Sequence, residues 1–127
     1  MELLVGLSVV LLFAHVLLQG MAATRELGSA WNAGPRDGDR RPTGVLAGRA
    51  ERASANFRET YPAFVALSLA LLVAGRGDGL GLAGAWVWFA FRLAYIPLYL
   101  AGIAYIRSLA WTGAAIGLAL MFAALLF

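Results

Sequence analysis

The chain has 127 residues, of which 61% are hydrophobic and 13% are charged. A soluble domain of this length keeps roughly a third of its extended-chain surface exposed, so this much apolar surface requires lipid as part of the solvent. The chain has no cysteine and one histidine, which excludes disulfides and a cysteine nucleophile, and we expect no metal site. The net charge is only +3, so nothing suggests a nucleic-acid partner.

The first predicted element is a membrane-spanning helix over about residues 2–23. Its apolar run is long enough to cross a hydrocarbon core of about 30 Å. The segment before that run holds Glu2 and no positive charge, which is the wrong sign for a signal peptide, so we expect a retained helix. His15 and Gln19 lie one turn apart on it, and we expect them to hydrogen-bond across helices.

A polar loop over about residues 24–47 follows, and its Gly, Pro and Asp residues are typical of surface turns. Most of the arginines lie in this loop or beside it: Arg25, Arg36, Arg40, Arg41, Arg49, Arg52 and Arg58. Positively charged loops stay in the cytoplasm, so an even number of helices places both termini in the periplasm. The absence of lysine and the richness in Ala, Gly and Arg fit a bacterial inner membrane.

The second predicted helix covers about residues 48–75, and its first half carries a polar stripe. The stripe consists of Arg49, Arg52, Asn56 and Glu59, which follow one another at intervals of three, four and three residues and so share one face. Arginines on one face suggest an anionic ligand, because arginine binds carboxylate or phosphate through two hydrogen bonds. Inside a bilayer, such a stripe must face protein or water.

The third predicted helix covers about residues 80–106 and carries Arg92 near its middle. Tyr95 and Tyr99 follow at i+3 and i+7, on the same face. A charge at this depth is costly without a partner. We predict an ion pair with Glu59, the deepest carboxylate of the neighbouring helix.

A tight connection over residues 75–79 joins the second and third helices, and a turn near residues 105–109 leads into a fourth, over about residues 108–127. The sequence therefore predicts an all-α membrane protein. Its single domain, residues 1–127, is a bundle of four transmembrane helices.

Three motifs resemble the MAPEG family, the membrane-associated proteins of eicosanoid and glutathione metabolism. The pattern Arg-Ala-x-x-Asn-x-x-Glu of the second helix is met at residues 52–59, with Pro62 shortly after. The third-helix pattern of an arginine, an aromatic three residues on and a tyrosine seven residues on is met at residues 92–99. An Arg-Ser pair near the start of the last helix is met by Arg107 and Ser108. The likeness covers residues 48–127 and is that of a short, bacterial-type member.

The resemblance implies a homotrimer that binds glutathione between protomers near the cytoplasmic side. It implies that the tripeptide site is lined by Arg52, Asn56, Glu59, Arg92 and Tyr99. Arg49 of the polar stripe and Tyr95 on the third helix join these as candidate binding residues.

The resemblance also implies that Arg107 and Ser108 lie near the sulfur as the catalytic pair. An arginine stabilises the thiolate, which is the form that attacks, and a serine donates a hydrogen bond to it. The second substrate is expected to be a lipophilic electrophile or hydroperoxide that enters from the membrane lipids.

The chain departs from the family pattern at three positions. Gly48 stands where an acidic residue is frequent, Ala55 where a polar or basic one is, and Trp111 where some eicosanoid-forming members have tyrosine. These departures argue against a prostaglandin-type specialisation.

Three functions stay open at this point. The first is a glutathione-dependent transferase or peroxidase. The second is a non-catalytic member that binds an anionic lipid or another thiol at the polar stripe. The third is a small transporter or channel subunit, which only Pro97 and Glu59 favour, because transporters use broken helices and ion-binding carboxylates.

Overall fold

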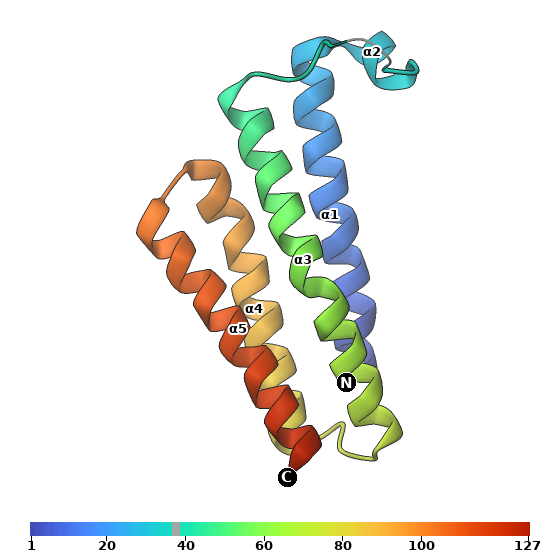
Figure 1. Ribbon diagram of the computed structural model, residues 1–127, viewed down its shortest axis with the longest axis vertical. Coiled ribbons are helices and arrows are strands. Elements are labelled where there is room, and N and C mark those ends of the chain that lie inside the picture. The colour runs from blue at the N-terminus through green and yellow to red at the C-terminus, as the bar shows by residue number, and fades with distance from the viewer. Residues whose placement is uncertain (37–38) are drawn as a thin grey trace.

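The computed structural model describes residues 1–36 and 39–127, and within them all regular structure is helical. Residues 37 and 38 of the predicted loop lie outside the described residues. Four long helices and one short helix follow one another: α1 (Glu2–Leu27), α2 (Ser29–Ala33), α3 (Val45–Val73), α4 (Gly79–Ala101) and α5 (Ala104–Leu126). The long helices run side by side, with α1 beside α3 and α4 beside α5, and both termini lie at one end of the bundle (Figure 1).

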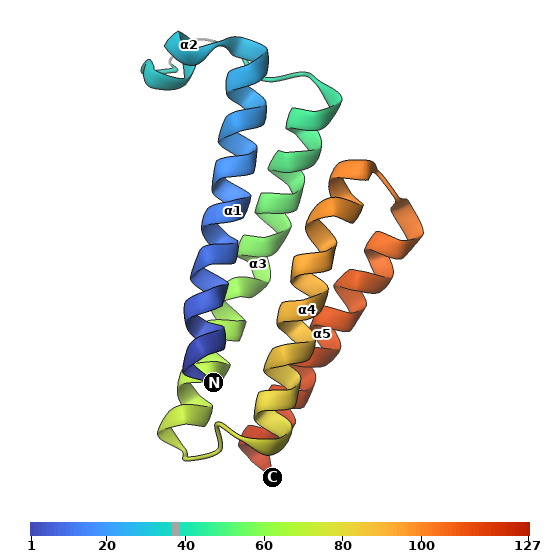
Figure 2. The same cartoon turned by 180° about the vertical axis from the view of Figure 1, so that it is seen from behind.

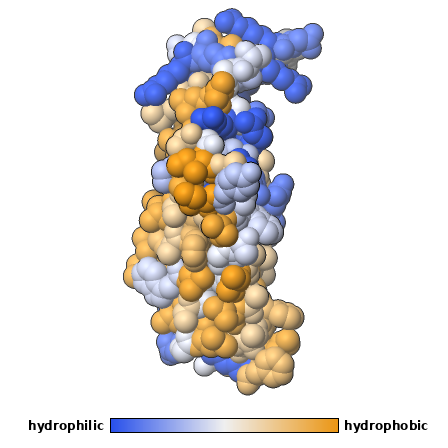
Figure 3. Space-filling view, turned by 90° about the vertical axis from the view of Figure 1, so that its left-hand side faces the viewer, coloured by the Kyte–Doolittle hydropathy of each residue, from blue (hydrophilic) through white to orange (hydrophobic). Residues whose placement is uncertain are grey.

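Helices α1, α4 and α5 are long and apolar enough to cross a membrane. Helix α3 has 29 residues, but its first half carries the polar stripe, which lowers its mean hydropathy. Figure 3 shows hydrophobic side chains over most of one face of the molecule and hydrophilic ones gathered at the end that holds α2 and the polar loop. An apolar surface along the helices with charges collected at one end is typical of an integral membrane protein.

Two predicted helix ends beside the polar loop were wrong. α1 continues to Leu27 instead of ending near residue 23, and α3 begins at Val45 instead of Gly48. The carboxylate of Glu26 explains the second difference. It accepts hydrogen bonds from the backbone N–H groups of Thr43 at 2.7 Å and of Gly44 at 2.9 and 3.0 Å. These bonds hold the end of α1 against the start of α3.

The predicted turn near residues 105–109 was also wrong. α4 ends at Ala101, and Gly102 follows with a φ of 79°, a left-handed conformation that glycine adopts without a steric penalty. α5 then begins at Ala104. Arg107 and Ser108 consequently lie in the first turns of a helix, where their backbone positions are fixed.

The core between α1, α3 and α4 is aromatic. Phe64 and Trp88 stack with their ring centroids 3.8 Å apart, and both are fully buried. His15 is also buried and stacks on Phe57 at 4.6 Å. The predicted hydrogen bond from His15 across helices was wrong, since within the described residues its Nε2 has no partner. Stacking holds this side chain in place instead.

Helices α4 and α5 approach each other closely over glycines. A Cβ atom on Gly117 would lie 2.5 Å from the backbone nitrogen of Trp88 and 2.7 Å from the carbonyl oxygen of Gly84. Small residues permit such backbone contact between helices in membranes. The view from behind shows α4 and α5 adjacent along their length, with α1 and α3 extending beyond the turn that joins them (Figure 2).

Candidate functional site

A cleft of about 240 Å³ opens where α3, α4 and α5 meet. Its lining residues combine amide, phenol, guanidinium, hydroxyl and indole groups: Asn56, Tyr95, Tyr99, Arg107, Ser108, Trp111 and Thr112. Both predicted catalytic residues and three of the predicted binding residues therefore share one cleft. One face of α3, the end of α4 and the start of α5 supply them.

Arg107 is the cation of this cleft. Its guanidinium carbon lies 4.6 Å from the centroid of the Tyr99 ring, a cation–π contact that fixes the side chain. Among the described residues, no carboxylate or carbonyl accepts a hydrogen bond from the Arg107 guanidinium, so its N–H donors are free for an anion. Ser108 donates its hydroxyl to the carbonyl of Ala104 at 3.2 Å, a long bond from which a hydroxyl can rotate away.

Arg92 lies behind the cleft and is only 1% exposed. It donates from Nη1 to Oδ1 of Asn56 at 2.8 Å and from Nη2 to Oγ1 of Thr60 at 2.5 Å. These bonds turn the Asn56 amide so that its NH₂ group faces the other way. That NH₂ group donates to Glu59 at 3.5 Å.

The predicted ion pair between Arg92 and Glu59 was therefore wrong. Within the described residues no salt bridge joins them, and Glu59 is exposed. Helix α3 is rotated so that Asn56 and Thr60 face α4, which leaves Glu59 at the margin. Neutral oxygen atoms accept hydrogen bonds from both Nη atoms of the buried guanidinium, and Asn56 lies between the two charges, while the Nε atom has no partner among the described residues.

The remaining members of the polar stripe do not line the cleft. Arg49 donates to the carbonyl of Leu100 at 2.9 Å, and so ties the start of α3 to the last turn of α4. A positive charge at the C-terminal end of α4 also interacts favourably with the dipole of that helix. Arg52 is exposed, as is Glu59, on the surface of the single chain. The stripe thus separates into one cleft residue, one structural tie and two surface charges.

Two residues of the cleft were missed as site residues. Trp111 and Thr112 each lie four residues after a member of the Arg107–Ser108 pair, so one helical turn places them on the same face. Thr112 also donates its hydroxyl to the carbonyl of Ser108 at 3.1 Å. The i+4 spacing was the signal that could have found both.

Within residues 1–36 and 39–127, no group of three or more His, Cys, Asp or Glu side chains is placed to hold a metal ion. The chemistry of the cleft is that of hydrogen-bond donors around one cation. Such a site can bind an anion and stabilise negative charge beside it.

The family to which the chain belongs follows from its likeness along the whole length. The model of the MAPEG family matches residues 3–127, which include the first helix and the polar loop as well as the three motifs. The comparison with curated proteins and the comparison with solved structures give no match. The three apolar helices agree with this match, because MAPEG proteins are membrane proteins. The cleft contains residues of all three motifs. The chain is an integral membrane protein that belongs to the MAPEG family.

Proposed function

We propose that the protein is a glutathione-dependent transferase or peroxidase that acts on lipophilic electrophiles in the membrane. The cleft carries this proposal, because it brings the free guanidinium of Arg107 beside the hydroxyl of Ser108 in a MAPEG chain. Tyr95, Tyr99 and Asn56 complete its wall. These residues come from three helices, and their common cleft supports the proposal.

The residues in and around the cleft fit the charges of glutathione, which has two carboxylates, one ammonium group and a thiol. Arg107 and the exposed Arg52 offer guanidinium donors to carboxylates or to the sulfur. Glu59 offers an exposed carboxylate to the ammonium group. When bound, glutathione supplies a thiol that attacks an electrophile as the thiolate.

Arg107 would stabilise negative charge on the sulfur and so lower the pKa of the thiol from about 8.5. The Ser108 hydroxyl would turn from the Ala104 carbonyl and donate to the same sulfur. The Tyr99 ring holds the guanidinium in place, and Arg92 orients the Asn56 amide from behind.

The homotrimer and a fourth spanning helix are part of the proposal. α3 has 29 residues, or about 43 Å at 1.5 Å per residue, which is enough to cross a bilayer. Arg52 and Glu59 are exposed on this helix, and charges at that depth avoid lipid. A second copy of the chain packed on this face would cover them and close the cleft. We further propose that the arginine-rich end faces the cytoplasm of a bacterial inner membrane.

Replacing Arg107 with alanine tests the catalytic role. We expect kcat/KM for glutathione and a chlorodinitrobenzene to fall by about 10²–10³, because one preorganised donor to the developing charge is lost. The rate should also rise with pH over a higher range than in the wild type, because the thiol loses its stabilising cation. Activity is measured in detergent, with the subunit number checked by native mass spectrometry.

Arg76→Ala is the matched control, because Arg76 lies at the other end of the bundle and bonds the carbonyls of Ala124 and Leu125. Full activity of a trimeric Arg107→Ala protein would overturn the role of Arg107. If the wild type binds no glutathione in calorimetry at millimolar concentration, the non-catalytic reading replaces the enzymatic one. Arg52→Ala serves there as the binding variant.

A further inference from the structure

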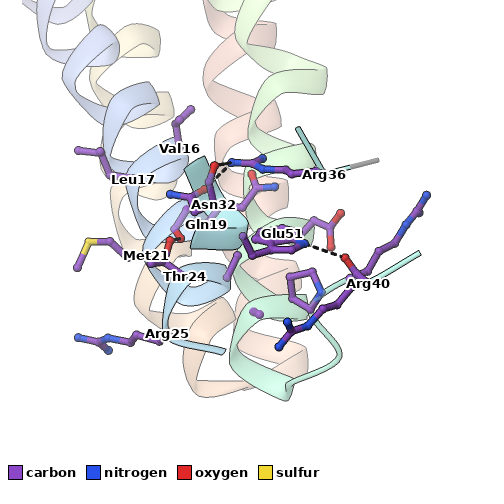
Figure 4. A pocket seen from close by; sticks show the side chains of 16 residues that line it. Val16, Leu17, Gln19, Met21, Thr24, Arg25, Asn32, Arg36, Arg40 and Glu51 are labelled. Atoms are coloured by element: carbon purple, nitrogen blue, oxygen red, sulfur yellow. Dashed lines mark hydrogen bonds between the residues drawn. The ribbon is translucent and has the colours of Figure 1, made fainter. Parts of the chain in front are cut away.

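A second and larger cavity, of about 990 Å³, lies at the arginine-rich end, between α1 and the polar loop. It shares no residue with the cleft. Figure 4 shows its two sides: Leu17 and Met21 come from α1 on one side, and Arg36 and Arg40 come from the loop on the other. The cavity therefore joins an apolar wall, formed by Leu17 and Met21 above Arg25 on α1, to a cationic wall formed by the loop (Figure 4).

The apolar wall is exposed on the surface of the single chain. Leu17 and Met21 are 60% and 53% exposed, and they lie one turn apart on the most apolar of the spanning helices. Four residues of helix cover about 6 Å along the bilayer normal. An alkyl chain lying on these side chains would be continuous with the surrounding hydrocarbon.

The cationic wall is held in place by Trp31. Its indole N–H donates to the carbonyl of Arg40 at 3.0 Å. The guanidinium of Arg36 lies 4.9 Å from the centroid of the Trp31 ring and donates to the carbonyl of Asn32 at 2.8 Å. Tryptophan is also the residue most typical of the membrane–water interface. With Trp31 at this interface, these contacts would hold the loop arginines at headgroup depth.

The guanidinium groups of Arg40 and Arg41 have no acceptor among the described residues. Of the residues that line the cavity, Glu51 alone carries a carboxylate, against four arginines, and no described salt bridge uses it. The cavity thus has a surplus of unpaired guanidinium groups. Their planar donors match the oxygen atoms of a phosphate.

We propose that this cavity binds an anionic glycerophospholipid of the adjoining leaflet. Its phosphate would accept hydrogen bonds from Arg40 and Arg41, and its acyl chain would lie along Leu17 and Met21. A soluble phosphate would use only the cationic wall, whereas a phospholipid uses both. The inference goes beyond the proposed function, since it does not depend on glutathione or on the cleft.

The test reconstitutes the full chain in nanodiscs of phosphatidylcholine that contain a minor fraction of phosphatidylglycerol. Native mass spectrometry then measures the ratio of the two lipids that stay bound. We expect wild-type protein to retain phosphatidylglycerol preferentially. The double variant Arg40→Gln/Arg41→Gln should lower that preference roughly 25-fold, since each arginine near an anionic surface contributes about a fivefold factor.

Arg58→Gln/Arg76→Gln removes the same charge outside the cavity and should change the ratio little. Leu17→Ser should weaken retention, whereas Val10→Ser, at an equally exposed position of α1 outside the cavity, should not. Equal losses in the two double variants would overturn the proposal in favour of general charge attraction. Displacement of the lipid by soluble glycerol phosphate would also overturn it, because the site would then recognise a free phosphate.

Discussion

Arg92 is fully buried in the bundle, and two neutral side chains accept hydrogen bonds from its Nη atoms, while its Nε has no partner among the described residues. Replacing Asn56 with leucine removes the acceptor at 2.8 Å and leaves a further guanidinium N–H group, that of Nη1, without a partner. We expect the free energy of unfolding to fall by about 1–3 kcal/mol, which is the cost of stranding a buried polar group. Denaturation in detergent, followed by circular dichroism, measures this loss.

Glu59→Ala is the informative control for Asn56→Leu, because it removes the carboxylate that an ion pair would use. Glu59 is exposed and meets Asn56 only at 3.5 Å, so its loss should change the free energy of unfolding by less than the loss of Asn56. A larger loss of unfolding free energy in Glu59→Ala than in Asn56→Leu would show that an ion pair between Glu59 and Arg92 stabilises the protein.

The need of Arg92 for a partner could be predicted from its position in an apolar run, but the partner could not. Asn56 and Glu59 lie three residues apart on one face of α3, and a rule based on charge selects the carboxylate. The choice depends on the rotation of α3 about its axis relative to α4. That rotation follows from packing around Phe57 and Phe64, which periodicity alone does not determine.

At the scale of elements, the contact between α4 and α5 depends on the absence of side chains. Gly117→Ala should destabilise the protein by about 1–3 kcal/mol, because the new methyl group would overlap the backbone of α4. Gly6→Ala, where the new Cβ would have no atom within 4 Å, should instead stabilise α1 by about 0.5–1 kcal/mol. Thermal unfolding in detergent measures both. Two changes of the same sign would contradict the close contact.

Helix existence could be predicted from the sequence better than helix ends. Helices α1, α4 and α5 arise where long apolar runs predict them, since membrane-spanning length is a strong signal, whereas α3 was predicted from the lack of Gly and Pro over residues 49–60 and from its polar stripe. Gly102 could have marked the end of α4, because glycine in a left-handed conformation commonly ends a helix. The start of α3 could not be placed, because it depends on Glu26, a residue from the far side of the loop.

At the scale of the whole molecule, hydropathy identifies α1, α4 and α5 but not α3. The reason is that the two halves of α3 have different neighbours. Its polar half lies beside the cleft, and its apolar half packs in the core. The spacing of the polar stripe predicted a functional face on this helix, and Asn56 lies in the cleft. Arg49 and Arg52 lie outside the cleft. Arg49 bonds the last turn of α4 and Arg52 is exposed, and neither the end of α4 nor the exposed face of α3 could be predicted from the spacing.

The charge distribution makes a prediction about orientation. Both termini lie at one end of the bundle, and the arginine-rich loop lies at the other (Figure 1). Because positively charged loops stay in the cytoplasm, alkaline phosphatase fused after Phe127 and expressed in a bacterium should be active, as this enzyme matures only outside the cytoplasm. The same enzyme inserted after Arg41 should be inactive, while a green fluorescent protein at the two sites should give the opposite pattern.

Replacing Arg36, Arg40 and Arg41 with glutamine should make the orientation less uniform, whereas Arg76→Gln, at the other end, should not. Phosphatase activity at the loop site in the wild-type chain would reverse the assignment and place the lipid cavity in the outer leaflet of the membrane.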